Sequence, residues 1–415
     1  MMTVSQMPSG LRYAVRRYGN AVGYCALSIK IGSRDEGLYH SGIAHFLEHT
    51  LFKGTSRRSS ASINNRLERL GGELNAFTTK EEIVLHATVL KKDLAKAASL
   101  LAEIAFDASF PEDEIEIEKG VVCDEIASYK DFPAEEIYDR FEEKIFAGSP
   151  LSRSILGTEQ SVRAIDSAEL RRFREEFFTP DRMVMTMVSS LEEDKMKAMI
   201  VKAFEPYLSA VTGSSPVGEL SLMQEPVSVS EQPFNMTVDK GNNQTNCVMG
   251  ALAPSLRERE RRLATLLLCN ILGGPASNSM LGSCIREKHG WAYNIECNYT
   301  PYSDSGVATI NFGCDKNNLK NCIRAIHRQI RKLQDAPLSE AALNRAKYQM
   351  LGQHSIGMEN GEAQCLSIGK SILSFGHVSS ESDVTGQIMG ITAAQLQQQA
   401  REVFDIDRMS TLIFL

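Results

Sequence analysis

The sequence lacks several features that mark specialised classes of protein. It has no run of about 18 apolar residues, and residues 1–18 lack the apolar core of a secretory signal, so we expect neither a membrane span nor a leader. No basic stripe accompanies the net charge of −7, which argues against a nucleic-acid partner. The nine cysteines form no C-x-x-C pair, and their odd number argues against a disulfide framework. We therefore expect a cytoplasmic protein in a reducing compartment.

What is present is an ordinary globular composition that contains an internal repeat. At 415 residues, 43% hydrophobic and 23% charged, the chain has room for two domains of about 200 residues each. The pattern Ile-x-x-Ala-x-Leu, then Phe, then Asp-Arg-Met begins at Ile165 and begins again 226 residues later at Ile391. We therefore predict a duplication, with a catalytic domain at 1–208, a linker at 209–228 and a homologous domain at 229–415.

In both halves, predicted strands neighbour one another in sequence and predicted helices come in runs. The first half predicts strands at 23–31, 82–89 and 183–188, and helices at about 42–54, 60–70, 92–106, 112–130, 134–146, 167–178 and 192–206. The second predicts strands at 234–238, 246–252, 293–300, 306–312 and 410–415, and helices at about 257–272, 277–288, 316–334, 338–354, 360–374 and 393–404. This order predicts an α+β fold of two homologous α/β-sandwich domains rather than a doubly wound parallel sheet.

The pentapeptide His-Phe-Leu-Glu-His at 45–49 is the strongest chemical signal in the chain. On a helix, His45, Glu48 and His49 project from one face. Two imidazoles one turn apart can bind one tetrahedral cation, typically zinc, and the carboxylate can act as a general base on a metal-bound water. An exposed helix with solvated histidines is the alternative, but Phe46 and Leu47 make this helix apolar elsewhere and favour burial. The spacing is that of an inverted zincin.

A third ligand is expected because a catalytic zinc usually has three protein ligands and one open position. The acidic segment that follows Pro111 predicts a helix, with Pro111 in its first turn. Glu118 and Glu125 are seven residues apart on this helix and therefore share one face. They could be a metal ligand and its neighbour, or part of a solvated acidic face, and the spacing alone leaves both open.

The segment Gly42-Ile-Ala-His-Phe-Leu-Glu-His-Thr-Leu-Phe-Lys-Gly-Thr55 closely resembles the signature of the pitrilysin, insulysin and mitochondrial processing peptidase family of inverted-zincin metallopeptidases. The second element of that family is a pair of glutamates seven apart, of which the later binds zinc. The resemblance implies that His45, His49 and Glu125 bind one Zn²⁺ per chain. It also implies that Glu48 is the general base and that Glu118 orients a ligand from outside the metal's direct contacts.

Leu70-Gly-Gly-Glu-Leu-Asn-Ala-Phe-Thr-Thr79 resembles the family's edge-strand segment. The resemblance implies that Asn75, Ala76 and Phe77 hold an extended substrate, which adds to the sheet edge through main-chain hydrogen bonds. Without the resemblance, the segment is an ordinary strand entered through a Gly-Gly turn.

Arg286-Glu-Lys-His-Gly-Trp-Ala-Tyr293 resembles the family's arginine and tyrosine seven apart. The resemblance implies that Arg286 and Tyr293 bind the substrate backbone and polarise the scissile carbonyl, whereas taken alone they would be a surface charge and a core aromatic. The glycine-rich turn at 272–281 matches less well, because Pro275 and Ser279 depart from the family's residues.

The resemblance covers essentially the whole chain, which has the length of one half of the family's working enzyme. It implies a zinc endopeptidase of the short bacterial type that cleaves peptides or unfolded segments inside a closed chamber. We expect a homodimer in which Arg286 and Tyr293 of one subunit complete the zinc site of the other. The alternative is a non-catalytic or heteromeric subunit of a complex similar to the processing peptidase.

Overall fold

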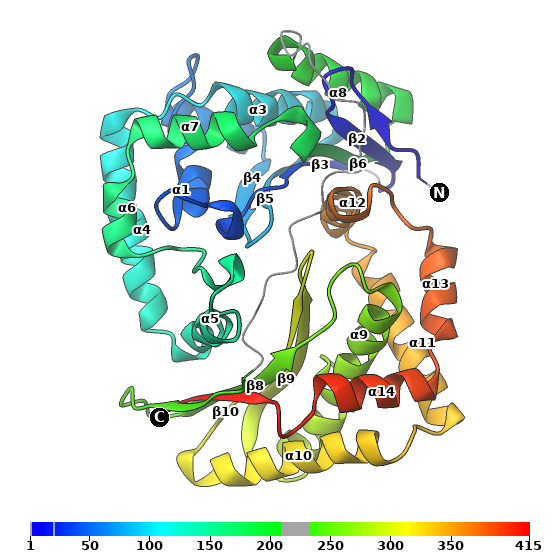
Figure 1. Cartoon of the computed structure of the whole chain (residues 1–415). Helices are drawn as coiled ribbons and strands as arrows, with labels where there is room; N and C mark the ends of the chain where they lie inside the picture. Colours follow the sequence, from blue (N-terminus) through cyan, green and yellow to red (C-terminus); the bar gives the residue numbers. More distant parts are fainter. Residues whose placement is uncertain (1, 20, 209–231) are drawn as a thin grey trace. The chain divides into compact units, whose positions relative to one another are not determined.

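The structure, a computed structural model, describes residues 2–19, 21–208 and 232–415, so the predicted linker at 209–228 lies outside the described residues. The chain separates into two compact units of helices packed on a sheet (Figure 1). Of the described residues, unit 1 contains 2–127, 153–208 and 356–380, and unit 2 contains 128–152, 232–355 and 381–415. Within these described ranges, no helix has the length and apolarity needed to cross a membrane.

Unit 1 is built on a six-stranded sheet with the order β1-β2-β6-β3-β5-β4. Strands β2 and β6 are parallel, and the other neighbours are antiparallel. The strands are β1 (Ser5–Gln6), β2 (Arg12–Arg17), β3 (Val22–Ile29), β4 (Glu73–Thr78), β5 (Ile83–Leu90) and β6 (Met183–Ser189). All seven residues of β6 are buried, as expected of a strand covered on both faces.

Helices cover both faces of the unit 1 sheet. Met185 and Met187 of β6 belong to the same core as α3 (Leu94–Asp107) and α8 (Glu193–Leu208). Val184 and Val188 instead pack with α12 (Gly361–Phe375), because successive side chains of a strand point to opposite faces. The other helices of this unit are α1 (Ile43–Thr50), α2 (Ser60–Glu68), α6 (Glu159–Ala164) and α7 (Ser167–Phe177), together with most of α4 (Glu112–Lys130).

Unit 2 is built on a five-stranded sheet with the order β7-β11-β8-β10-β9. Its strands are β7 (Asn235–Val238), β8 (Thr245–Leu252), β9 (Ala292–Pro301), β10 (Gly306–Cys314) and β11 (Ser410–Phe414). Strands β7 and β11 are parallel, and the remaining neighbours are antiparallel. The helices are α5 (Pro133–Ile145), α9 (Arg259–Gly273), α10 (Leu319–Asp335), α11 (Glu340–Gly357), α13 (Glu381–Gly390) and α14 (Ala393–Val403).

The two sheets have the same topology, which confirms the predicted duplication and the α+β class. Strands β7, β11, β8, β10 and β9 repeat β2, β6, β3, β5 and β4 in order and in pairing direction. Helices α7 and α14 begin at Ser167 and Ala393, which preserves the offset of 226 residues seen in the sequence.

The units exchange one equivalent helix each. Helix α5 follows α4 in the first half of the chain but packs on β8 and β11 in unit 2. Helix α12 follows α11 in the second half but packs on β3 and β6 in unit 1. The predicted domains, 1–208 and 229–415, do not contain this exchange. An apolar helix face predicts that the helix is buried, but it does not predict which of two similar sheets covers it.

Most predicted elements occur near their expected positions, with a few differences. The helix predicted at 277–288 is mainly a short π-helix, η5 (Gly282–Glu287). Helix α1 ends at Thr50 rather than at residue 54, because the chain turns after it. Strands β1 and β2 and helices α6 and α13 were not predicted.

Candidate metal centre

Helix α1 carries the predicted histidine pair on one face and apolar residues on the other. Its eight residues include buried Ile43, Phe46 and Leu47, which anchor the helix in the unit 1 core. This burial fixes the opposite face and leaves His45 and His49 side by side, with ring centroids 4.6 Å apart. The predicted one-face arrangement is therefore present.

Helix α4 supplies Glu118 and Glu125. Its acidic first turn stabilises the positive end of the helix dipole, and Ile115, Val122 and Ile126 are buried against the unit 1 core. Glu118 is buried, whereas the side chain of Glu125 is 43% exposed. The two carboxylates thus face α1 from one helix in different surroundings.

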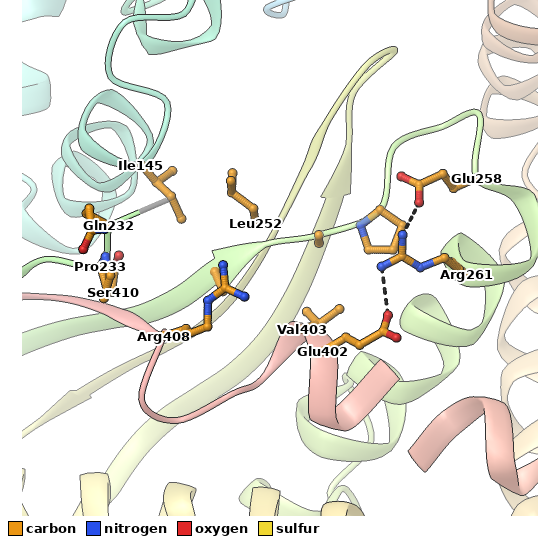
Figure 2. Close-up of a pocket in the computed structure, with 13 residues that line it drawn as sticks. Ile145, Gln232, Pro233, Leu252, Glu258, Arg261, Glu402, Val403, Arg408 and Ser410 are labelled. Atoms are coloured by element: carbon orange, nitrogen blue, oxygen red, sulfur yellow. Dashed lines mark hydrogen bonds and ion pairs between the residues drawn. The ribbon is translucent and has the colours of Figure 1, made fainter. Parts of the chain in front are cut away.

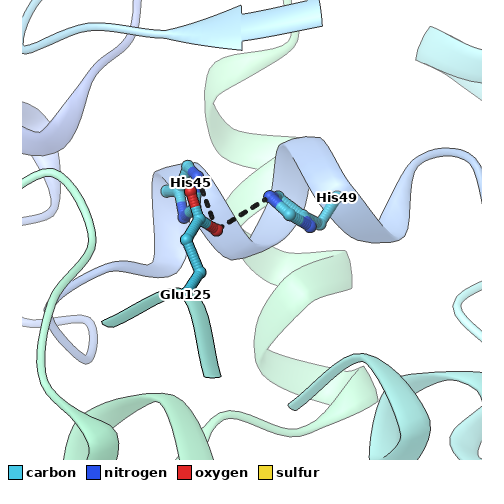
Figure 3. Close-up of side chains that lie close together, drawn as sticks. All are labelled: His45, His49 and Glu125. Atoms are coloured by element: carbon cyan, nitrogen blue, oxygen red, sulfur yellow. Dashed lines mark ion pairs between the residues drawn. The ribbon is translucent and has the colours of Figure 1, made fainter. Parts of the chain in front are cut away.

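Three donor atoms converge where α1 faces α4 (Figure 3). Glu125 Oε2 lies 3.8 Å from His45 Nε2 and 3.6 Å from His49 Nε2, and all three atoms lie within 4.8 Å of one another. These separations are too long for hydrogen bonds. A tetrahedral zinc with bonds of about 2.0–2.2 Å separates its ligand atoms by roughly 3.3–3.6 Å, and the two carboxylate–imidazole separations are close to this range. In the described part of the chain, no other group of three such residues lies this close together.

His49 is held by a chain of charged groups behind it. His49 Nδ1 lies 2.8 Å from Glu118 Oε1, and the other oxygen of Glu118 pairs with Lys53. Burial opposes ionisation of Glu118, but the hydrogen bonds from His49 and Lys53 outweigh it and lower the pKa of Glu118. Burial also opposes protonation of His49, yet its bond to Glu118 and the nearby carboxylates raise the pKa of His49. Such a carboxylate fixes which ring nitrogen of a histidine faces the metal.

His45 lies deeper and lacks an equivalent support. Its ring is buried, and Nδ1 has no hydrogen-bond partner among the described residues. Burial, with a smaller effect from His49, lowers the pKa of His45 to about 3. The imidazole is therefore neutral at pH 7, which is the form that binds a metal ion.

Glu48 projects from the same face of α1 and does not belong to the donor set. Thr78 Oγ1 at the end of β4 donates to Glu48 Oε2 at 3.2 Å. Burial raises the pKa of Glu48, although His49 and Thr78 act in the opposite direction. A raised pKa brings a carboxylate closer to the pH at which a general base works best.

The predicted substrate strand is the edge strand of unit 1. In β4, Asn75 pairs with His86, Ala76 with Leu85 and Phe77 with Val84, all on β5. The other side of β4 pairs with no strand among the described residues. The edge is thus unpaired up to Thr78, the residue that contacts Glu48.

The residues around the donor set match a known family of peptidases. The family model described as Insulinase (Peptidase family M16) matches residues 14–159, a range that includes all three donors. The chain belongs to peptidase family M16. A second M16 model, described as Peptidase M16 inactive domain, matches residues 164–350.

Relatives and solved structures agree with this membership. A protein of Mycobacterium tuberculosis named as an uncharacterized zinc protease is 31% identical over 399 residues, covering 96% of this chain and 89% of the relative. The uncharacterized zinc protease YmxG of Bacillus subtilis is 30% identical over 385 residues, covering 93% of this chain and 91% of the relative. The crystal structure of a protease from Helicobacter pylori shares the fold, with a TM-score of 0.90 at 20% identity, covering 100% of this chain and 99% of that one.

The second M16 model also spans Arg286 and Tyr293, and both residues lie in unit 2. Arg286 is in η5 and forms an ion pair with Glu287 at 2.9 Å. Tyr293 is the second residue of β9, and 89% of its surface is exposed. The structure does not place either residue in the compact unit that holds the donor set.

Sequence reasoning missed two residues that contact the predicted site residues: Lys53 pairs with Glu118, and Thr78 donates to Glu48. Lys53 lies four residues after His49, a spacing that brings side chains together on a helix, but α1 ends before it. Thr78 lies within the quoted edge-strand segment, and its contact with Glu48 depends on how α1 packs on β4. Neither residue carries a signal of its own in the sequence.

Proposed function

We propose that this chain is a zinc-dependent endopeptidase with one Zn²⁺ per chain, held by His45, His49 and Glu125. The observation that carries the proposal is the convergence of two imidazole nitrogens and one carboxylate oxygen within 4.8 Å. These three groups cannot satisfy one another by hydrogen bonds, whereas a divalent cation satisfies all of them. The zinc proteases named among its relatives support the same metal.

The chemistry proposed is amide hydrolysis. When bound, zinc would polarise the scissile carbonyl and lower the pKa of a water molecule. Glu48 accepts the proton of the attacking water and returns it to the leaving amine, while Thr78 holds the Glu48 carboxylate in place. Glu118 fixes His49 through Nδ1. The unpaired edge of β4 at Asn75, Ala76 and Phe77 binds the substrate as an added strand.

The test is Glu48→Gln, with Glu116→Gln as a matched control on an exposed face of α4. We expect Glu48→Gln to bind zinc as the wild type does but to lose most peptidase activity on a quenched fluorescent peptide. The control should keep its activity, and a chelator should abolish the wild-type activity. Full activity in Glu48→Gln would remove Glu48 from the mechanism, and chelator-resistant cleavage would remove zinc.

We also propose a homodimer that encloses peptides or unfolded segments, in which Arg286 and Tyr293 of one subunit complete the zinc site of the other. The exposure of Tyr293 supports this, because such a large side chain is available to another chain. Mixing inactive Glu48→Gln with inactive Tyr293→Ala subunits should restore about a quarter of wild-type activity, since half of the dimers are mixed and each has one intact site. No recovery after subunit exchange, or a fully active monomer, would contradict the dimer.

We further propose a cytoplasmic location, supported by nine cysteines that are all free thiols, eight of them buried. A heteromeric complex remains the alternative assembly. It predicts that the purified chain binds zinc but cleaves peptides only after a second subunit is added.

A further inference from the structure

The zinc helix α1 begins without a cap of its own. Its N-cap residue is Gly42, which has no side chain, and the first turn contains no acidic residue. A Ser, Thr, Asp or Asn is strongly preferred at this position, because its side-chain oxygen accepts a hydrogen bond from a free N–H group of the first turn. This gap matters for α1 because His45 is only its third residue.

Position 42 must be glycine for reasons unrelated to capping. Gly42 has φ +87°, a left-handed conformation that favours glycine, and a Cβ there would lie 2.6 Å from the carbonyl oxygen of Leu156. The backbone of the preceding loop is therefore packed directly against residues 156–157. A side-chain cap cannot come from residue 42 and has to come from elsewhere.

Glu36 supplies the missing cap from six residues upstream. Its Oε1 accepts hydrogen bonds from Gly42 N at 3.0 Å and from Ala44 N at 3.2 Å. The loop between them is fastened to α7, because His40 pairs with Glu169 and Tyr39 packs on Phe173. The Glu36 side chain thus closes this loop onto the first turn of α1.

The surroundings of Glu36 favour a neutral carboxylic acid. The residue has no exposed surface, and Oε2 has no hydrogen-bond partner among the described residues. Burial raises the pKa of Glu36 to about 8, against the bonds from Ala44 and Gly42 and the charge of Arg153, while Asp35 raises it further. A glutamine has the same shape and is always neutral, so it should accept the same two hydrogen bonds at pH 7.

We propose that Glu36 is a positioning residue of the zinc site, which caps α1 in place of Gly42 and fixes its first turn so that His45 is ordered before the metal binds. The proposal rests on the zinc site proposed above. A frayed first turn would have to be ordered by the metal itself, which lowers the apparent affinity by the fraction of molecules already competent. Glu36 touches neither metal nor substrate, so its effect acts through the helix.

The experiment measures zinc affinity by competition with a chromogenic chelator for the wild type, Glu36→Ala and Glu36→Gln. Losing a helix cap costs enough to weaken zinc binding by about 3- to 30-fold in Glu36→Ala. Glu36→Gln should stay within about twofold of the wild type, because its amide oxygen accepts the same two bonds. Peptidase activity of Glu36→Ala should approach that of the wild type when zinc is saturating.

The matched control is Thr392→Ala, which removes the side-chain cap of α14 in unit 2. It should lower the free energy of unfolding without changing zinc affinity. Equal zinc affinity in Glu36→Ala and the wild type, or an equal loss in Thr392→Ala, would overturn the role of Glu36. If Glu36→Ala does not fold, Glu36→Asp tests the same point, since its shorter acid cannot reach both N–H groups and should give a measurable loss. A wild type that binds no zinc would instead overturn the proposed function itself.

Discussion

In unit 1, helices α1 and α4 meet through His45, His49 and Glu125. The Glu125 carboxylate oxygen lies 3.8 Å from the His45 ring nitrogen and 3.6 Å from the His49 ring nitrogen. In unit 2, helices α9 and α11 occupy the same places in the chain order, with α9 between β8 and β9 and α11 after α10. There Asn270 Nδ2 of α9 donates to Gln353 Oε1 of α11 at 2.9 Å. The same helix pair is therefore joined by an amide hydrogen bond in unit 2. In unit 1 the His49–Glu118 hydrogen bond lies beside three donor atoms that form no hydrogen bonds with one another.

The difference shows what a metal site requires from a duplicated scaffold. Two amides are complementary, since each has donors and acceptors, and they satisfy one another at hydrogen-bond distance. Imidazole nitrogens and a carboxylate oxygen that converge at longer range need a cation between them. The scaffold places facing side chains on the two helices in both units, and the residue types at these positions decide between a direct amide hydrogen bond and a set of donors suited to a cation.

Glu125→Gln replaces the carboxylate of unit 1 with an amide like that of Gln353 in unit 2. It should produce the largest effect on zinc binding and on peptidase activity. Removing a direct metal ligand should weaken zinc binding by more than about 100-fold, beyond the loss typical of a supporting residue, and should abolish peptidase activity. Zinc content and chelator competition measure this. The reciprocal Gln353→Glu should leave zinc at one per chain, because Asn270 cannot replace two imidazoles. Two zinc ions per chain in that variant would break the comparison.

Glu118→Gln tests the carboxylate that is hydrogen-bonded to His49. Unit 2 has no carboxylate at the equivalent position. Glu118 precedes Glu125 by seven residues, whereas the residue seven before Gln353 is Ala346. Losing the charged partner of His49 and Lys53 should weaken zinc binding by about 10- to 100-fold, with the fold intact. Chelator competition and a thermal melt measure the two effects. An unchanged affinity would mean that the backbone alone orients His49.

The convergence of side chains in unit 1 could be predicted from the sequence, because its signals are local. The spacing of His45, Glu48 and His49 places them on one face of any helix, and two glutamates seven apart share a face for the same reason. The duplication was visible because helix, turn and strand kept one offset. Each of these inferences needs only the periodicity of one element.

The missed features depend on which elements pack together. Strand β2 has the sequence Arg-Tyr-Ala-Val-Arg-Arg and lies beside buried β6. Its three arginines interrupt the apolar pattern by which a strand is predicted. The exchange of α5 and α12 could not be predicted because both sheets present similar apolar faces. Thr78 and Glu36 act through single contacts with α1, which no pattern in their own segments encodes.

The exchanged helices α12 and α5 each make a close contact with the central strands of their sheets. In unit 1 the close contact is between Gly369 of α12 and Ser28 of β3, where a Cβ at 369 would lie 2.6 Å from Ser28 Oγ. In unit 2 the small residue is on the strand instead, where a Cβ at Gly250 of β8 would lie 2.4 Å from the carbonyl oxygen of Ala308 and 3.2 Å from the Phe141 ring of α5. The register makes Ser28 and Gly250 equivalent, because their partners on β6 and β11 are 226 residues apart.

Gly369→Ala should therefore destabilise the protein by about 1–3 kcal/mol, the usual cost of overpacking a close contact. The double variant Gly369→Ala with Ser28→Gly, which moves the small residue to the strand as in unit 2, should recover part of this loss. Chemical denaturation of the single and double variants measures both effects. A loss that is simply additive would show that the two positions do not share one contact.

The smallest expected effect comes from the glycines inside the two equivalent long helices. Gly120 of α4 and Gly352 of α11 have open space where a Cβ would lie, and neither has a left-handed φ. Alanine at either position should raise the free energy of unfolding by about 0.4–1 kcal/mol, because it restricts the unfolded chain. Denaturation curves measure this gain, and the peptidase assay separates the two units.

Gly352→Ala should leave activity unchanged, and so should Gly120→Ala if α4 only has to hold Glu125 rigidly. A fall in activity for Gly120→Ala alone would indicate that flexibility at Gly120 of α4, unlike flexibility at Gly352 of α11, contributes to turnover.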